Sequence, residues 1–222
     1  MGVMTEYRPH SDTRDYIPAA GRHAFLPGYD LLTRVMGMAS VYDALLEQAE
    51  LTDGSRVLEI GCGTGNVTVR AKQLCPGADL VGLDPDPRAL ARAQRKARGL
   101  TGIRFERGYS QRLPFGDGEF DRVLSSMMLH HLDEEAKRAT AAEVLRVLRP
   151  GGKLHIVDIG GHMTPADGFM ARRFLRNKHA AGNLGDAIPR LLAEAGFDCT
   201  ETASRRHRFV GRLTFYRATR PE

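Results

Sequence analysis

Three glycines alternate with other residues in the stretch VLEIGCGTGN, residues 57–66, and this turn is the part of the sequence best suited to hold a ligand. Gly61, Gly63 and Gly65 let a ligand approach bare backbone and permit positive φ angles. The helix expected to follow presents unpaired amide N–H groups and a partial positive charge, which suit a carboxylate or a phosphate. The turn alone does not decide between these groups, and it could also be a tight connection with no ligand.

Two acidic residues narrow the choice of ligand. A dinucleotide-binding turn reads G-x-G-x-x-G, whereas this one reads G-x-G-x-G with Asn66 at the third position, which favours a ligand without pyrophosphate. Glu59, two residues before the first glycine, can order the turn or hold an ammonium group through water. Asp84 ends an apolar run nineteen residues after Gly65, where its carboxylate can accept from two ribose hydroxyls or cap a helix. The combination indicates a cofactor that contains adenosine and an amino acid.

The elements that must position these residues alternate between apolar strand-like runs and helical patterns. Such alternation predicts a parallel sheet covered on both faces. The expected strands are 56–60, 79–83, 103–106, 120–125 and 153–159, and the expected helices are 66–74, 87–98 and 134–148. A basic helical segment at 165–179, a helix at 184–195 and strands at 197–203 and 208–217 follow, and two short helices with a break near Gly37 lie between 26 and 50. We expect an α/β fold: a doubly wound, seven-stranded sheet of five parallel strands plus a C-terminal antiparallel hairpin, with helices on both faces.

Length and polarity define the expected domain organisation. At 222 residues the chain is long enough for one domain with a substantial core. Residues 1–25 are polar and show no sustained apolar period, so they are expected to form a flexible arm or lid. Residues 26–222 are expected to form a single domain, with a helical insert at about 160–183.

Charge, cysteine content and hydropathy bound the class of protein. A formal charge of +5 permits nucleic-acid binding without implying it. Arginines alternate with apolar residues near the C-terminus, as on a solvated strand face or at a polyanion site: Arg205, Arg206, Arg208, Arg212, Arg217 and Arg220. The three cysteines fit neither a disulfide framework nor a zinc site. No apolar run reaches membrane-spanning length, and the first twenty residues are too polar for a signal peptide. We therefore expect a cytoplasmic protein without a transmembrane segment.

Several motifs in order resemble the class I S-adenosylmethionine-dependent methyltransferases. The stretches VLEIGCGTGN, LVGLDPDP, RGYSQRLPF, FDRVLSSMMLHHL and EVLRVLRPGGKLHIVD match the family's successive motifs and cover about residues 55–160. LPGYDLLTRVMG, residues 26–37, is similar to the N-terminal helix region of the small-molecule subgroup that includes quinone-biosynthesis enzymes. The resemblance implies a Rossmann-like fold, S-adenosylmethionine as cofactor and methyl transfer to a small-molecule or lipid-like acceptor.

The resemblance also assigns residues to the cofactor site. These are Glu59, Gly61, Cys62, Gly63, Gly65, Asp84, Pro85, Tyr109, Ser110, Gln111, Ser126 and Met127. One departure stands on the adenine side, where the family usually reads Gly-Asp-Ala and this chain reads Gly108-Tyr109-Ser110. The usual carboxylate partner of the adenine amino group is thus replaced, and Tyr109 can stack on the base or present its hydroxyl.

Methyl transfer needs an acceptor held in line with the S–CH₃ bond, and a base only when the acceptor carries a proton. His130 and His131, after the fourth strand, are the candidate bases, although adjacent residues on a turn cannot both face the methyl group. Tyr29, His131, His162 and Arg173 are the candidate acceptor-binding residues, the last two because the insert is expected to cover the acceptor pocket. Asp158 is expected to anchor a neighbouring loop, and no metal site is expected.

Other functions remain open on the sequence alone. A non-catalytic sensor could retain the cofactor, and a nicotinamide-dependent dehydrogenase shares the sheet and the acid, although Asn66 counts against it. Nucleic-acid methylation is not expected, because the chain lacks both an Asn/Asp-Pro-Pro-Tyr segment and a Pro-Cys nucleophile. The atom methylated (O, N or C) and the choice between monomer and homodimer are undecided.

Overall fold

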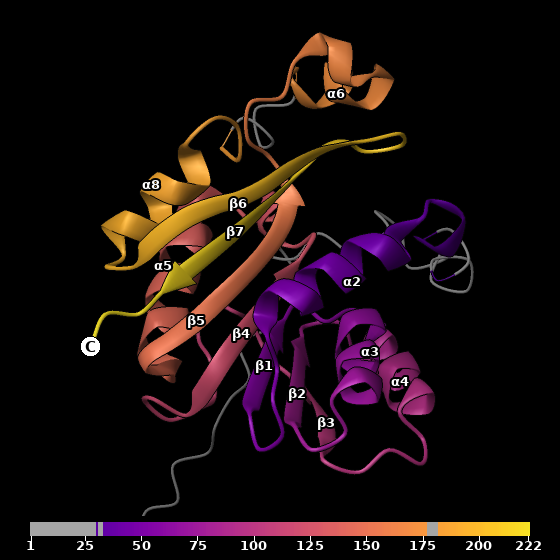
Figure 1. Ribbon diagram of the computed structural model, residues 1–222, viewed down its shortest axis with the longest axis vertical. Coiled ribbons are helices and arrows are strands. Elements are labelled where there is room, and N and C mark those ends of the chain that lie inside the picture. The colour runs from indigo at the N-terminus through magenta and orange to yellow at the C-terminus, as the bar shows by residue number, and fades with distance from the viewer. Residues whose placement is uncertain (1–29, 31–32, 177–181) are drawn as a thin grey trace, which may run out of the picture.

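The computed structural model describes residue 30, residues 33–176 and residues 182–222, and its centre is a seven-stranded sheet (Figure 1). The strands are β1 (Arg56–Ile60), β2 (Asp79–Asp84), β3 (Ile103–Arg107), β4 (Phe120–Ser126), β5 (Leu148–Ile159), β6 (Asp198–His207) and β7 (Gly211–Thr219). Their order across the sheet is β3-β2-β1-β4-β5-β7-β6. The first five are parallel, and β7 pairs antiparallel with both β5 and β6. This confirms the predicted sheet and its C-terminal hairpin.

Helices cover both faces of this sheet. They are α2 (Met38–Ala49), α3 (Asn66–Leu74), α4 (Pro87–Lys96), α5 (Glu134–Val147), α6 (Phe169–Phe174) and α8 (Ala187–Glu194), with 3₁₀ turns η2 (Leu129–His131) and η3 (Pro165–Asp167). In β1 the side chains alternate: Leu58 joins a core cluster with α5 and α8, whereas Val57 joins a second cluster with α2 and α3. Two apolar faces leave little room for polar residues in the central strands, which explains their nearly continuous hydrophobic runs.

Some predicted boundaries are wrong near the C-terminus. β5 begins five residues earlier than expected, at Leu148, which pairs with Phe120. The segment expected to be one helix at 165–179 is divided at Gly168, whose φ of 122° ends η3 before α6 begins; residues 177–181 lie outside the described residues. The hairpin turn falls at 208–210, so the second hairpin strand begins at Gly211, three residues later than predicted. Of the two helices expected between 26 and 50, the second is α2, and the first falls largely on residues outside the described ones.

The strand order reverses between β1 and β4, because β2 and β3 lie on one side of this pair and β5 on the other. In open α/β sheets, ligands bind in the crevice that such a reversal creates beyond the carboxyl ends of the strands. The turn 61–65 follows β1 at this point, and Asp84 ends the neighbouring β2. Within the part of the chain that the structure describes, no helix is long and apolar enough to cross a membrane.

Candidate functional site

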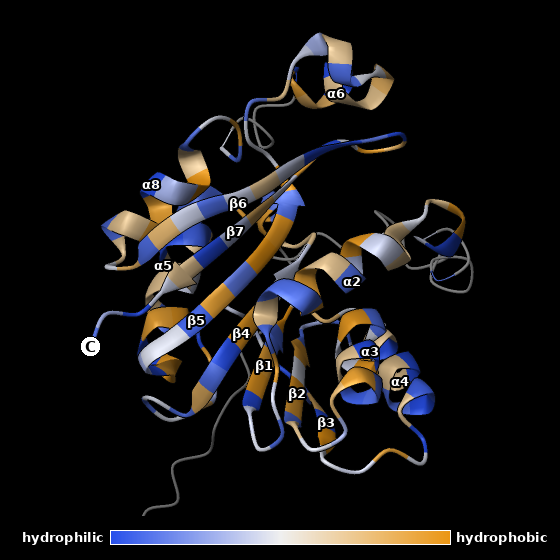
Figure 2. Cartoon of the chain, viewed as in Figure 1, coloured by the Kyte–Doolittle hydropathy of each residue, from blue (hydrophilic) through white to orange (hydrophobic). Residues whose placement is uncertain are grey.

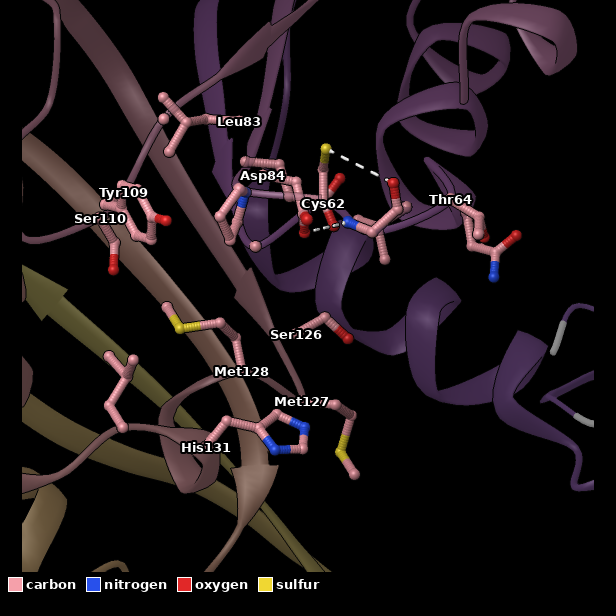
Figure 3. Close-up of a pocket in the computed structure, with 18 of the residues that line it drawn as sticks. Cys62, Thr64, Leu83, Asp84, Tyr109, Ser110, Ser126, Met127, Met128 and His131 are labelled. Atoms are coloured by element: carbon pink, nitrogen blue, oxygen red, sulfur yellow. Dashed lines mark hydrogen bonds between the residues drawn. The ribbon is translucent and has the colours of Figure 1, made fainter. Parts of the chain in front are cut away.

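A cavity that is open to solvent lies at the carboxyl ends of β1, β2 and β4 (Figure 3). It runs from Tyr109 and Ser110 past Asp84 and the glycine turn to Met127 and His131. Its lining includes eleven of the twelve residues predicted to bind the cofactor: Glu59, Gly61, Cys62, Gly63, Asp84, Pro85, Tyr109, Ser110, Gln111, Ser126 and Met127. The fold thus brings together residues that are up to 68 positions apart in the sequence.

Gly65 is the predicted residue that does not line this cavity. Its φ is 76°, and a Cβ there would lie 2.8 Å from the Cβ of Ala93 and 3.2 Å from the ring of Phe105. Gly65 therefore lets α3 and α4 approach each other closely. Gly61 serves the cavity directly, because its φ is 67° and a Cβ would collide with the side chain of Met128.

The N-terminus of α3 opens on the cavity. Gly65 is its N-cap, no side chain caps the helix, and Asn66 and Val67 of its first turn line the cavity. Uncapped amides at a helix N-terminus bind carboxylates and phosphates. This end of the cavity is suited to the carboxylate of an amino acid.

Asp84 is 7% exposed and lies between the turn and the cavity. Its Oδ2 accepts from the amide of Gly63 at 2.8 Å and its Oδ1 from the amide of Asp86 at 2.9 Å. Burial raises the pKa of this carboxyl group, and the two amide donors oppose that shift. The helix cap that Asp84 could have provided is supplied by Asp86, which accepts from the amide of Arg88 at 2.8 Å. Each Asp84 oxygen keeps a further lone pair for a ligand hydroxyl.

Glu59 lies beneath the turn and is 2% exposed. The hydroxyl of Thr68 on α3 donates to its carboxylate. Burial, with a smaller contribution from the nearby Asp84 carboxylate, raises the pKa of Glu59 to about 8 in spite of the hydrogen bond from Thr68. The environment therefore disfavours the negative charge unless a positive group enters the cavity, as the ammonium of an amino acid would.

The adenine side of the predicted site has an exposed aromatic ring. Tyr109 is 41% exposed at the cavity wall, and Ser110 is buried, with its hydroxyl 2.9 Å from that of Thr140. Because the Ser110 hydroxyl is engaged inside the protein, this segment offers a ligand its backbone and the side chains of Tyr109 and Gln111.

The opposite end of the cavity is formed by the loop after β4. Ser126 lines it, and its hydroxyl is buried without a hydrogen-bond partner among the described residues. Met127 adopts a φ of 56°, unusual for a residue with a side chain, and its amide donates to Val157 at 2.8 Å. An unpartnered buried hydroxyl in a cavity wall indicates a place for a polar ligand group.

Asp158 anchors this loop, as predicted from the sequence. It is fully buried, accepts from the amide of Leu129 at 2.8 Å, and its Oδ1 lies 2.6 Å from Nδ1 of His130. Burial opposes the negative charge of Asp158, but the positive field of His130 and these hydrogen bonds hold its pKa below the ordinary value. His130 therefore belongs to the support of the loop and does not line the cavity.

His131 is the histidine that faces the cavity (Figure 3). The centre of its ring lies 4.0 Å from that of the His130 ring, and the two rings are tilted by 42°. Burial and, to a lesser degree, the neighbouring His130 together lower the pKa of His131 to about 4, against the opposing charge of Asp158. The imidazole is consequently neutral at physiological pH and has a lone pair that can accept a proton or a hydrogen bond.

Two of the other predicted acceptor-binding residues, His162 and Arg173, do not line the cavity. His162 is exposed, with its ring 3.7 Å from the carboxylate of Asp186, and Arg173 is exposed on α6. Tyr29 lies outside the described residues. The insert approaches the site through Phe174, whose ring is edge-on to His130 at 6.4 Å. Among the described residues, no group of three or more His, Cys, Asp or Glu side chains is placed to hold a metal ion.

Sequence reasoning missed eight residues of the cavity wall: Tyr42, Thr64, Asn66, Val67, Leu83, Gly108, Met128 and Leu132. Seven of them adjoin predicted residues and could have been found by extending each motif by one to three positions. Tyr42 had no such signal, because α2 reaches the cavity only through its packing against the sheet. A polar network around the turn was also unforeseen: Asp30 accepts from Thr64 at 2.6 Å and pairs with Lys96 at 2.7 Å.

Comparison with known proteins agrees with this geometry. Residues 57–152 match the model of a methyltransferase domain. An uncharacterized methyltransferase of Synechocystis is 34% identical, over 75% of this chain and 76% of that protein. A demethylmenaquinone methyltransferase of Thermus thermophilus is also 34% identical, over 77% of this chain and 88% of that protein.

The fold is also found in solved structures. A phosphoethanolamine N-methyltransferase of Haemonchus contortus, in complex with S-adenosylhomocysteine, superposes with a TM-score of 0.68 at 19% identity, over 82% of this chain and 53% of that one. The glycine turn, the strand-end acid, the order of the sheet and the two relatives lead to one conclusion. This chain belongs to the class I S-adenosylmethionine-dependent methyltransferases.

Proposed function

We propose that this methyltransferase modifies a small, lipid-like aromatic acceptor, a quinol ring, and that His131 accepts the proton which the acceptor releases. The observation that supports this most is the neutral, buried imidazole of His131 at the end of the cavity beyond Ser126. The apolar side chains of Met127, Met128 and Leu132 surround that end. The Thermus relative is named for a quinone acceptor, and we choose the reduced form of such a ring, the quinol, because it carries the hydroxyl group that His131 would face.

The described residues fit S-adenosylmethionine. When bound, this cofactor supplies a methyl group on a positively charged sulfur, which is electrophilic without further activation. We assign the amides of the first turn of α3 to its carboxylate, Glu59 to its ammonium group and Asp84 to its ribose hydroxyls. Tyr109 would lie against the base, and the unpartnered hydroxyl of Ser126 would meet the amino-acid end.

The chain's own contribution to the chemistry is then positional. His131 would accept a hydrogen bond from the acceptor hydroxyl. It would take that proton as the S–CH₃ bond breaks and the new bond to the acceptor forms, the stage at which the hydroxyl is acidic enough for an imidazole of lowered pKa. Asp158 would fix the loop from behind through His130, and the methionines would exclude water from the reacting atoms. Phe174 supports the further proposal that residues 160–183 cover this end of the cavity within a single domain of residues 26–222.

Radiolabelled methyl donor, incubated with a water-soluble naphthoquinol, tests this proposal. We expect label in the quinol, little in the oxidised quinone, which lacks the acidic hydroxyl, and none in RNA. His131→Asn should lower kcat by about a hundredfold, since positioned bases typically contribute that much or more, while affinity for S-adenosylhomocysteine changes little. Cofactor binding without turnover on the quinol, or on a fractionated metabolite extract, would instead support a sensor. Label in RNA would contradict the acceptor class.

A further inference from the structure

α6 and the turn of the β6–β7 hairpin form one surface at the end of the molecule nearest to the loop of His131 (Figure 1). A side chain at Gly211 would meet Ala171, so the helix and the strand are in close contact. Arg212 of β7 pairs with the buried Asp167 of η3 through two hydrogen bonds, of 2.8 and 3.2 Å. Val210, in the turn, is buried in the same cluster as Ala171. These contacts fix the two elements relative to each other.

The hairpin extends beyond its neighbour in the sheet. β5 ends at Ile159, opposite Leu213 of β7. Past that point the hairpin strands pair with each other, Arg206 opposite Arg212 and His207 opposite Gly211. Figure 2 shows a strongly hydrophilic end of β6 beside a hydrophobic turn. The turn therefore stands away from the sheet, with α6 as its neighbour.

This surface carries positive charge that nothing in the described structure neutralises. Six arginines of α6, of the residue pair that follows it and of the hairpin are exposed: Arg172, Arg173, Arg176, Arg205, Arg206 and Arg208. None of the ion pairs formed among the described residues includes any of these six. In the segments 161–176 and 204–212 the single acidic residue is Asp167, which Arg212 already neutralises.

Two phenylalanines are exposed among these arginines. Phe169, at the start of α6, is 81% exposed, and Phe209, in the hairpin turn, is 43% exposed. The guanidinium of Arg208 lies over the Phe209 ring, 5.5 Å from its centre. Exposed aromatic rings flanked by arginines are characteristic of protein surfaces that lie on lipid headgroups, where the rings leave water and the cations meet phosphate.

We propose that α6 and the β6–β7 turn dock this enzyme on an anionic lipid bilayer. Phe169 and Phe209 would enter the boundary between headgroups and acyl chains, and the exposed arginines around them would contact lipid phosphates. The role of this docking rests on the proposed function, since a lipid-like acceptor would reach the cavity from the bilayer past Phe174 and His130. A lipid surface is favoured over a nucleic acid because it accounts for the arginines, the exposed rings and the acceptor together.

Vesicle sedimentation of the full chain at low salt tests this proposal. We expect at least tenfold tighter binding to vesicles of equimolar phosphatidylglycerol and phosphatidylcholine than to phosphatidylcholine alone, with a steep loss as salt rises. Arg176→Glu with Arg206→Glu should weaken this binding at least tenfold, and so should Phe169→Ser with Phe209→Ser. The matched control is the double variant Arg95→Glu with Arg98→Glu, which makes the same charge change on exposed arginines at the end of α4 and just beyond it. This control should bind the vesicles as tightly as the wild type does.

The same proteins are then assayed for methyl transfer to the water-soluble naphthoquinol, which needs no bilayer. Unchanged transfer in the docking variants, together with lost vesicle binding, supports the proposal. Absence of wild-type binding to anionic vesicles, equal loss in the control, or binding to RNA but not to vesicles overturns it. A wild type that binds vesicles but does not methylate the quinol contradicts the proposed acceptor instead, so the two failures are distinguishable.

Discussion

Glu59 makes the stability of the cofactor-free protein depend on pH. Its pKa rises from 4.5 to about 8 on folding because the carboxyl group is buried. Between these two values the unfolded chain is ionised there while the folded chain remains protonated, so this contribution to stability is present below pH 4.5 and is lost as pH rises towards 8. Glu59→Gln keeps the shape without the titration. Its melting temperature should therefore exceed that of the wild type by a margin that grows over this range, to roughly several degrees.

Thermal melts of both proteins from pH 5 to pH 8.5 measure this margin. Glu47→Gln, at an exposed position of α2, is the matched control, because it removes a carboxyl group that folding leaves exposed. A margin for Glu59→Gln that does not grow with pH relative to this control would show that Glu59 is already ionised in the empty site. The same variant should bind S-adenosylhomocysteine more weakly than the wild type, because its neutral amide cannot pair with the ammonium group.

Tyr109 replaces the carboxylate that the family usually places beside adenine, and its exposed ring suggests stacking as the substitute contact. Base–aromatic stacking is worth about 1–3 kcal/mol. Calorimetry with S-adenosylhomocysteine should therefore show a five- to hundredfold weaker complex for Tyr109→Ala and a nearly unchanged one for Tyr109→Phe. Equal losses in the two variants would assign the contact to the hydroxyl.

The packing of α3 against α4 depends on a glycine at the end of the turn. Gly65→Ala combines a positive φ with a Cβ only 2.8 Å from Ala93, whereas Gly54→Ala places a side chain at φ 81° with nothing within 4 Å. Both substitutions carry the cost of the left-handed backbone, of the order of 1 kcal/mol. Urea unfolding should therefore show Gly65→Ala to be less stable than Gly54→Ala by about 1–3 kcal/mol, the usual cost of overpacking. Equal destabilisation would mean that the helices separate without cost.

The parallel strands and α3 were predictable because their apolar runs and the glycine turn are local signals. Helix 66–74 was predicted to the residue, since Gly65 and the turn define its start. The region after Gly160 was not, because its structure depends on distant contacts. Gly161 forms β-bridges with Leu184 and Gly185, so α8 begins only at Ala187. The ion pair between Arg212 and Asp167 holds η3 against β7. The helical periodicity of a sequence does not predict such long-range contacts.

The cofactor side of the cavity was predictable for a related reason: its residues stand at the ends of consecutive strands, which meet at one edge of a parallel sheet. The acceptor side was predicted less well. His131 lines the cavity, but His162 and Arg173 do not, and Tyr42 comes from a helix whose sequence shows only a packing face. These positions depend on how the insert and α2 pack on the sheet. That packing cannot be predicted from the pattern of a single sequence.

The central claim is that S-adenosylmethionine lies in the crevice between β1 and β4, with its ribose on Asp84. Calorimetric affinity for S-adenosylhomocysteine, measured for Asp84→Ala and for Asp79→Ala at the other end of β2, tests it most directly. The account predicts a loss of at least tenfold for Asp84→Ala, from removal of charge-assisted hydrogen bonds, and an unchanged affinity for Asp79→Ala, with both proteins still folded. Wild-type affinity in a folded Asp84→Ala would contradict it.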